Sequence, residues 1–231
     1  MNKRSARLVF PFIAVMVLGG VGSAAATQQR DASSEYRFKV WLDGEPIGYH
    51  KVNVTQEANR KTVHTQANLD VRVLFVPVYS YVHETREHWV DNCLVDIRST
   101  TDDNGENYFV RSMQHEAQQV FETRDGVISL DGCVRTFAYW DIRLLESKRL
   151  LNTQTGEYLP VEFTDLGTAT LDVDDEQIEA RLFRLATDET VIDLWYTSDM
   201  RWLALESITD SGAVLRYLPE KPAAYSMEAD S

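Results

Sequence analysis

Cysteine is scarce in this sequence. The chain has only two cysteines among its 231 residues, Cys93 and Cys133, and no Cys-x-x-Cys pair of the kind that indicates a redox site. Each follows a short polar turn, at residues 91–92 and 131–132. We expect the two cysteines to be joined in a disulfide, which would stabilise the fold by roughly 3–4 kcal/mol. The alternative is a pair of separately buried thiols.

Catalytic signatures are also missing. The sequence contains no Gly-x-Ser-x-Gly motif and no glycine-rich phosphate loop. The acidic run at residues 102–106 lacks the spacing of an EF-hand, so a hairpin tip is the better interpretation than a calcium site. We therefore predict no catalytic residue, no metal and no cofactor, and we expect a protein that is not an enzyme.

A long hydrophobic run occurs only near the N-terminus. Residues 8–21 are mainly apolar, basic residues precede them (Lys3, Arg4, Arg7), and small residues follow at 23–26. This order predicts a secretory signal peptide over residues 1–26, cleaved near Ala25 or Ala26, and a periplasmic protein. The alternative is an uncleaved membrane anchor, but the run is shorter than the ~20 residues that a spanning helix needs. No later segment is apolar enough to span a membrane.

Basic residues are the minority of the charged residues. The chain has 23 Lys and Arg against 36 Asp and Glu, a formal net charge of −13, and loss of residues 1–26 would leave 20 basic residues and a charge of −16. Such a chain does not attract nucleic acid or an anionic membrane through general electrostatics. We expect no nucleic-acid partner and no stable membrane span after removal of the signal.

The clearest pattern that is present runs from Lys61 to Trp89. In its first arm apolar and polar residues alternate, and this period of two predicts a strand with one buried face. The residues expected on that face are Val63, Thr65, Ala67, Leu69, Val71, Val73 and Phe75. Pro77 cannot donate a ladder hydrogen bond, so we expect a corner or an edge there. The second arm places on one face Tyr79, Tyr81, His83, Thr85, Glu87 and Trp89.

Short alternating segments fill most of the remaining chain. Polar turns separate them, with the strongest hairpin signal at Asn104-Gly105. The pattern predicts an all-β fold: a single curved antiparallel sheet, half-barrel or open barrel-like, built as a meander. We expect one β domain over residues 35–218, preceded by a flexible lead-in at 27–34 and followed by a loose tail at 219–231.

One segment has helical rather than strand spacing. Trp140, Leu144, Leu145 and Leu151 recur with charged residues between them, which predicts an amphipathic helix over residues 139–151 that crosses the sheet. Asp141 is a suitable N-cap for that helix.

Several of these stretches together resemble a known family. They are the hairpin LDGEPIGYHKV, the segment VRVLFVPVYSYVHETREHWVDNCL, TDDNG, FAYWD, LLNTQTGEY, LWYTSDMRWLALES and GAVLRYL. The chain resembles the exported bacterial family of unknown function DUF6134, and its layout is similar to that of DUF3108. The resemblance covers about Glu35 to Leu218 and implies a curved, half-barrel-like antiparallel sheet, with no established activity or catalytic residues.

The densest polar cluster lies at residues 83–88. His83 and Glu87 share one face of the predicted strand, whereas His88 lies on the other face, so the two histidines do not join in one metal site on a flat strand. Most aromatic residues are expected to fill the core. An incompletely closed sheet would nevertheless leave an apolar groove with a few polar anchors, which is the usual form of a small-ligand site.

Our first functional hypothesis is non-enzymatic binding of an apolar or amphipathic ligand, such as a lipid, in the groove of the sheet. The alternatives are an envelope interaction or assembly module with a filled core, and a hydrolase or metal enzyme that uses the His83 region. The candidate ligand-binding residues are Tyr79, Tyr81, His83, Glu87, Trp89 and Trp140.

Overall fold

The structure, a computed structural model, describes residues 32–73, 75–113, 118–174 and 176–220. These residues form a 13-stranded antiparallel sheet, a separate two-stranded sheet and a short 3-10 helix. The strand order of the large sheet is β11-β12-β13-β14-β15-β1-β2-β3-β4-β5-β6-β7-β8. The predicted signal peptide and residues 221–231 of the predicted tail lie outside the described residues.

The strands that precede residue 131 follow one another in space as they do in sequence. They are β1 (Ala32–Leu42), β2 (Glu45–Glu57), β3 (Arg60–Val73), β4 (Val76–Val90), β5 (Cys93–Asp103), β6 (Glu106–Met113), β7 (Gln119–Thr123) and β8 (Gly126–Leu130). The second group is β11 (Glu162–Val173), β12 (Glu176–Ala186), β13 (Val191–Tyr196), β14 (Trp202–Ile208) and β15 (Val214–Pro219).

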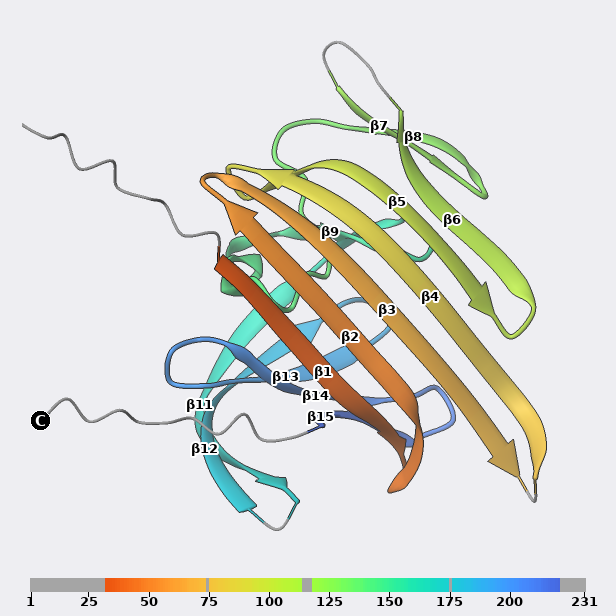
Figure 1. The fold of residues 1–231 in the computed structure, drawn as a ribbon, viewed down its shortest axis with the longest axis vertical. Helices are drawn as coiled ribbons and strands as arrows, with labels where there is room; N and C mark the ends of the chain where they lie inside the picture. The colour runs from red at the N-terminus through yellow and green to blue at the C-terminus, as the bar shows by residue number, and fades with distance from the viewer. Residues whose placement is uncertain (1–31, 74, 114–117, 175, 221–231) are drawn as a thin grey trace, which may run out of the picture.

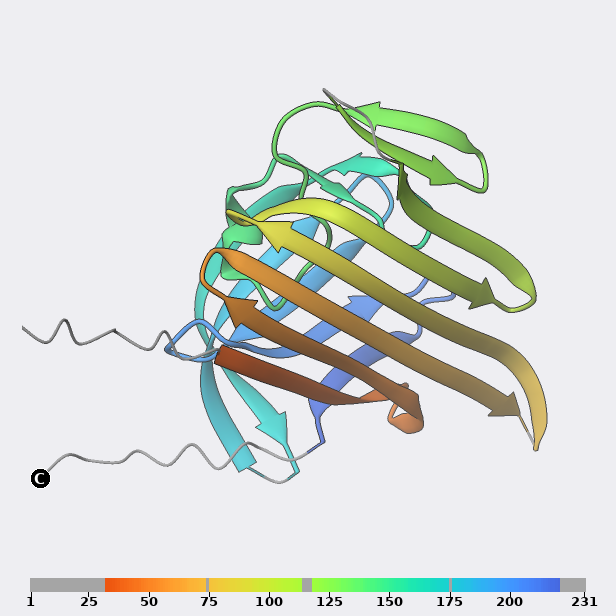
Figure 2. The same cartoon turned by 45° about the horizontal axis from the view of Figure 1, so that its top comes forward.

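The large sheet is curved and does not close. Figures 1 and 2 show β1–β6 as one long face, with β11–β15 curving behind it. The strands β11 and β8 stand at the two ends of the strand order and do not pair with each other. The prediction of an all-β fold dominated by one antiparallel sheet is therefore confirmed.

The first and last described strands pair in the middle of the sheet. β1 lies between β2 and β15, with Phe38 opposite Pro219 and Leu42 opposite Leu215. The two meanders are thus joined into one surface by strands that are far apart in the sequence. β1 begins at Ala32, inside the predicted lead-in, because Ser34 already pairs with Val54 of β2.

The β3–β4 hairpin confirms most of the predicted alternation. Val63, Ala67 and Leu69 are buried, as are the inward positions of β4 from His83 to Trp89. The prediction is wrong at Phe75, which is 94% exposed. Phe75 adopts a positive φ of 70° in the turn that precedes β4, so it has left the alternating face of β3. Beyond a bulge at Val78 of β4, Pro77 pairs with Arg72 inside the hairpin.

The helix predicted over residues 139–151 is wrong. The described residues contain no α-helix; this segment holds only the 3-10 helix η1 (Ile142–Glu146) and β9 (Arg149–Leu151), which pairs with β10 (Tyr158–Pro160). Leu150 and Leu151 are both fully buried, and an extended chain that is covered on both sides can bury two adjacent residues. The N-cap prediction is confirmed, since the Asp141 carboxylate accepts a hydrogen bond from the Arg143 backbone N–H at 3.2 Å.

Residues 131–161 form a plug between the two halves of the sheet. This segment leads from β8 to β11, which are the opposite ends of the strand order. Figures 1 and 2 place η1 and β9 inside the curve of the sheet. Val134, Leu144 and Leu150 of the plug pack in one core cluster with Phe38 and Trp89 of the sheet. The plug thus takes the role that was expected of the helix, without helical backbone.

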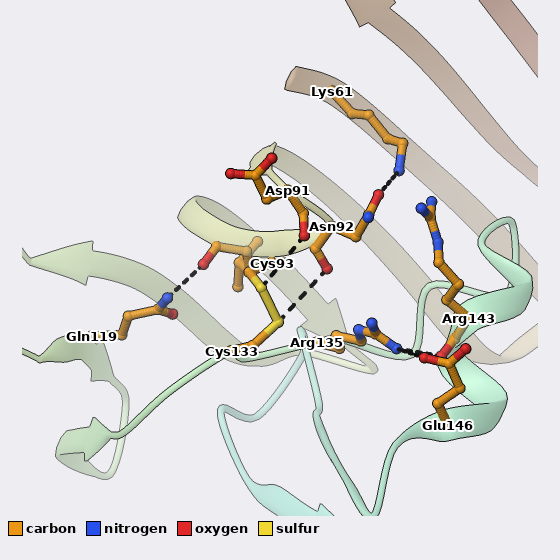
Figure 3. Close-up of a disulfide and its surroundings, with 10 residues drawn as sticks. Lys61, Asp91, Asn92, Cys93, Gln119, Cys133, Arg135, Arg143 and Glu146 are labelled. Carbon is orange, nitrogen blue, oxygen red and sulfur yellow. Dashed lines mark hydrogen bonds and ion pairs between the residues drawn. A yellow bond between two sulfur atoms is a disulfide. The ribbon is translucent and has the colours of Figure 1, made fainter. Parts of the chain in front are cut away.

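A disulfide attaches the plug to the sheet, as predicted. Cys93 at the start of β5 is bonded to Cys133 at the start of the plug, with the two Cα atoms 5.0 Å apart. Figure 3 shows this bond beside the β4–β5 turn, where Asn92 accepts a hydrogen bond from the Lys61 ammonium at 2.8 Å. No helix of the described residues is long and apolar enough to cross a membrane.

Candidate functional site

A cavity of about 390 Å³ lies between the concave face of the sheet and the plug. We call it the central cavity. Its walls come from the inward face of β2–β4, from the plug, and from the facing strands β13–β15. The sheet residues that line it include His50, Val52, Thr65, Ala67, Tyr81, His83, Thr85 and Glu87, and the plug and the facing strands add Thr136–Trp140, Asn152–Gln154, Ile192, Trp202 and Tyr217.

The strand register explains why this space exists. His50, Ala67 and His83 are direct cross-strand partners on β2, β3 and β4, so the small alanine lies between the two histidines. Strands lie about 4.8 Å apart, which places the two imidazole-bearing residues roughly 10 Å from each other. A methyl group in the middle of that row leaves room above β3 that a larger side chain would fill.

The His83 imidazole is held by threonine hydroxyl groups. Its Nδ1 lies 2.8 Å from the Thr101 hydroxyl and its Nε2 lies 2.7 Å from the Thr85 hydroxyl. A third hydroxyl, from Thr153 of the plug, lies 3.5 Å from Nε2. Burial lowers the pKa of His83 to about 4, so the ring is uncharged at neutral pH.

The surroundings of the His50 imidazole are different. Both of its ring nitrogens are buried, and neither has a hydrogen-bond partner among the described residues. The ring is surrounded by aromatic side chains, with ring centroids 5.2 Å away at Tyr217, 5.8 Å at Trp202 and 6.4 Å at Phe38. Burial, with a smaller contribution from His83, lowers the pKa of His50 to about 3.

Glu87 is a buried carboxyl group on the same face of β4. Its Oε2 accepts a hydrogen bond from the Trp89 indole N–H at 2.9 Å. Burial raises the pKa of Glu87 to about 7, although the hydrogen bonds from Trp89 and Thr136 oppose that shift. A substantial part of this carboxyl is therefore uncharged near neutral pH.

Tyrosine hydroxyl groups complete the polar part of the lining. The Tyr81 hydroxyl donates a hydrogen bond to Gln154 Oε1 at 3.2 Å, and Gln154 Nε2 donates to Asp103 at 3.0 Å. Burial raises the pKa of Tyr81 and of Tyr139 above the ordinary value, and it raises the pKa of Tyr217 to about 12. The tyrosines are therefore neutral hydrogen-bonding groups.

The structure distributes the predicted site residues over two environments. Tyr81, His83, Glu87 and Trp140 line the central cavity. Tyr79 does not line it, and Trp89 is a core residue that is 1% exposed and packs edge-on against Trp140 at 5.6 Å between ring centroids.

Sequence reasoning missed several lining residues, above all His50, Tyr139, Trp202 and Tyr217. For His50 a signal was available. It lies in phase with Val52 and Val54, which are buried on the inward face of β2, so strict alternation would have placed it inside.

Metal-ligating side chains do not gather in the part of the chain that the structure describes. No group of at least three His, Cys, Asp or Glu residues there is arranged to hold a metal ion. At the β5–β6 hairpin the Asp102 carboxylate accepts a hydrogen bond from the Gly105 backbone N–H at 2.8 Å, which is a hairpin-turn contact.

The geometry defines a class of protein: an open, plugged antiparallel sheet with a partly polar cavity on its concave side. A family model described as "Domain of unknown function (DUF6134)" matches residues 38–220. The chain therefore belongs to this family.

A solved structure supports the fold. The chain is similar to a beta-barrel-like protein of the domain of unknown function DUF1849 from Brucella abortus, with a TM-score of 0.59 and 11% sequence identity. The similarity covers 81% of this chain and 95% of that chain. At this identity the match describes the fold alone. No curated protein matches the sequence.

Proposed function

We propose that this protein is an exported, periplasmic binding protein that takes up a small amphipathic ligand in the central cavity without transforming it chemically. The observation that carries the proposal is the cavity itself, which measures about 390 Å³. Small-ligand sites commonly measure roughly 300–1,000 Å³ and combine apolar walls with a few polar groups. Rings such as Trp140 and Trp202 supply the apolar walls, and His83 and Tyr81 supply polar groups.

The cavity favours binding over the alternative of an assembly module with a filled core. The cavity is open to solvent where exposed residues such as Glu157 line it, so a ligand can enter a space that a filled core would lack. The small Ala67 between His50 and His83 keeps this part of the cavity open.

The proposed location depends on two features of the chain. Residues 1–26 have the composition of a cleavable signal, and a disulfide joins Cys93 to Cys133. Disulfides persist in oxidising compartments such as the bacterial periplasm. A fusion of residues 1–26 to a reporter that is active only after export tests the location directly, and a reporter retained in the cytoplasm would contradict it.

Ala67→Phe tests the ligand site. The new ring would occupy the space between His50 and His83, so binding of a fluorescent fatty alcohol should weaken at least tenfold. The matched control is Val82→Phe, which adds the same bulk to the outward face of β4, where Val82 is 48% exposed. Native mass spectrometry of protein purified from the periplasm should show a bound lipid in the wild type and in the control but not in Ala67→Phe. Equal binding by all three proteins would contradict a site in the central cavity.

A further inference from the structure

His50 has hydrogen-bonding capacity that the described part of the protein does not use. An uncharged imidazole carries one N–H donor and one nitrogen acceptor. The other histidine of the cavity, His83, has both nitrogens within hydrogen-bond distance of threonine hydroxyls, whereas both nitrogens of His50 lack partners. Buried polar groups are nearly always paired, so an imidazole that lines the cavity with both nitrogens buried and unpaired is a group that a ligand can pair when the rings around it move aside.

The charges around the cavity limit what that ligand group can be. No lysine or arginine occurs among the described residues that line the cavity. Acidic side chains do line it: Glu157, Glu189 and Asp210 are exposed, and Glu87 is buried. An anionic head group would enter without a cationic partner and would meet carboxylates, and an unpaired charge in a buried site is strongly unfavourable.

A cationic head group fits the interior no better. Burial keeps His50 and His83 uncharged, and it keeps a substantial part of Glu87 protonated near neutral pH. The other acidic residues of the lining are exposed, where salt screens their interaction with a cation. A quaternary ammonium group also has no N–H or O–H to offer the acceptor nitrogen of His50.

We propose that the ligand of the central cavity has an uncharged, hydroxyl-bearing head group, and that His50 anchors this group by donating one hydrogen bond to it and accepting one from it. The two ring nitrogens point to different sides of the imidazole, so two hydroxyl groups of one head group make these bonds: one accepts from the N–H and the other donates to the second nitrogen. The aromatic rings of Tyr217, Trp202 and Phe38 around His50 would cover the apolar part of the ligand next to the head group. This inference rests on the proposed function, because it assigns a ligand class to the same cavity.

The test compares three amphiphiles that share an eight-carbon chain and differ only in the head group. Octyl glycerol ether is neutral and carries hydroxyl groups, octanoate is anionic, and octyltrimethylammonium is cationic. Isothermal titration calorimetry with the mature protein at neutral pH should show the tightest binding for octyl glycerol ether, by at least tenfold over each charged amphiphile.

Variants of His50 test the anchor itself. His50→Phe keeps a ring of similar size but removes both nitrogens, so the affinity for octyl glycerol ether should fall at least tenfold. His50→Gln keeps one donor group and one acceptor group, so it should recover part of that loss. The matched control is His64→Phe on the outward side of β3, where His64 lies 2.9 Å from Glu84; this variant should bind like the wild type. Thermal unfolding of each variant checks that the fold is intact.

The outcomes separate this inference from the proposed function. Tightest binding of octanoate or of octyltrimethylammonium would overturn the inference and leave a ligand-binding cavity in place. Undiminished binding by a folded His50→Phe variant would overturn the role of His50 as the anchor. Failure of the wild type to bind any of the three amphiphiles would overturn the proposed function, and the inference with it.

Discussion

Glu87 makes the stability of the fold depend on pH. Its folded pKa is raised from the ordinary value of 4.5 to about 7 because the carboxyl is buried. A folded state that holds its proton more tightly than the unfolded chain is most stable below the unfolded pKa and loses stability as the pH rises through the folded pKa. The contribution of Glu87 is thus fully present below pH 4.5 and is lost by about pH 7.

Glu87→Gln should therefore gain stability over the wild type as the pH rises. The difference in unfolding free energy should be near zero at pH 4 and should reach about 3 kcal/mol above pH 7, since each pKa unit corresponds to about 1.4 kcal/mol. The amide oxygen of the variant can still accept the Trp89 N–H. Urea unfolding at a series of pH values measures the effect. Parallel curves for the two proteins would show that burial does not perturb this carboxyl.

The two cavity histidines act on stability in the opposite direction. Their folded pKa values are lowered by burial, to about 3 for His50 and about 4 for His83, from the ordinary 6.5. The unfolded chain then binds protons that the folded state does not, so stability falls as the pH drops below 6.5. A fall in pH therefore lowers the free energy of unfolding through the two histidines, and a rise in pH lowers it through Glu87.

At the residue scale the sequence predicts which face of a strand a side chain lies on better than it predicts whether that side chain lines the cavity. Alternation places Tyr81, His83 and Glu87 on the inward face of β4, and that is where they lie. It does not distinguish a ring that lines the cavity from one that fills the core, such as Trp89. That difference depends on which segment packs above each position, and here the segment is a plug whose backbone the local sequence does not specify.

A buried ion pair fastens the plug to the sheet at the scale of single elements. The Lys61 ammonium lies 3.4 Å from the Asp141 carboxylate, and each side chain is 8% exposed. Burial lowers the pKa of Lys61, and the charge of Asp141 opposes that shift. Burial would raise the pKa of Asp141, but hydrogen bonds from Arg143 and the charge of Lys61 outweigh it, so that pKa is lowered.

Removing the carboxylate of this pair alone should cost more than removing both charges. Asp141→Asn leaves the buried Lys61 ammonium without a carboxylate, and the loss of one partner of a buried pair typically costs about 3–5 kcal/mol. Lys61→Met should cost less, because the Asp141 carboxylate keeps its ion pair with Arg143 at 2.7 Å. Lys61→Met with Asp141→Asn removes both charges and should be more stable than the Asp141→Asn variant. Chemical unfolding of the two single variants and the double variant gives the coupling energy. A double variant that loses the sum of both single effects would mean that the two side chains are not coupled.

The crossing segment shows where reasoning from sequence fails at the element scale. Trp140, Leu144 and Leu151 have helical spacing, and all three do pack inward. A helix would have left Leu150 beside its polar face, whereas the structure buries it between two layers. Hydrophobic periodicity arises when one side of an element is buried and the other is exposed. A segment that is buried on both sides therefore has no periodic pattern.

At the scale of the whole molecule the disulfide holds the plug within the sheet. The bond between Cys93 and Cys133 closes a loop with a sequence separation of 40 residues. Closing a loop of that length should stabilise the fold by about 4 kcal/mol. Cys93→Ala with Cys133→Ala should lower the urea midpoint accordingly, and reduced wild type should match the double variant. No change in the midpoint on reduction would contradict this stabilising role.

The pairing of β1 with β15 has a consequence for the order in which the molecule is made. The ribosome completes β1 long before β15, yet β1 occupies the middle of the finished sheet and needs β15 beside it. In a nascent chain one edge of β1 therefore stays unpaired until the final strand has been made, and contacts this distant in sequence form slowly. Completion of the sheet beside β1 thus waits for the last strand, and under the proposed export the sheet would still be incomplete while the chain is transported.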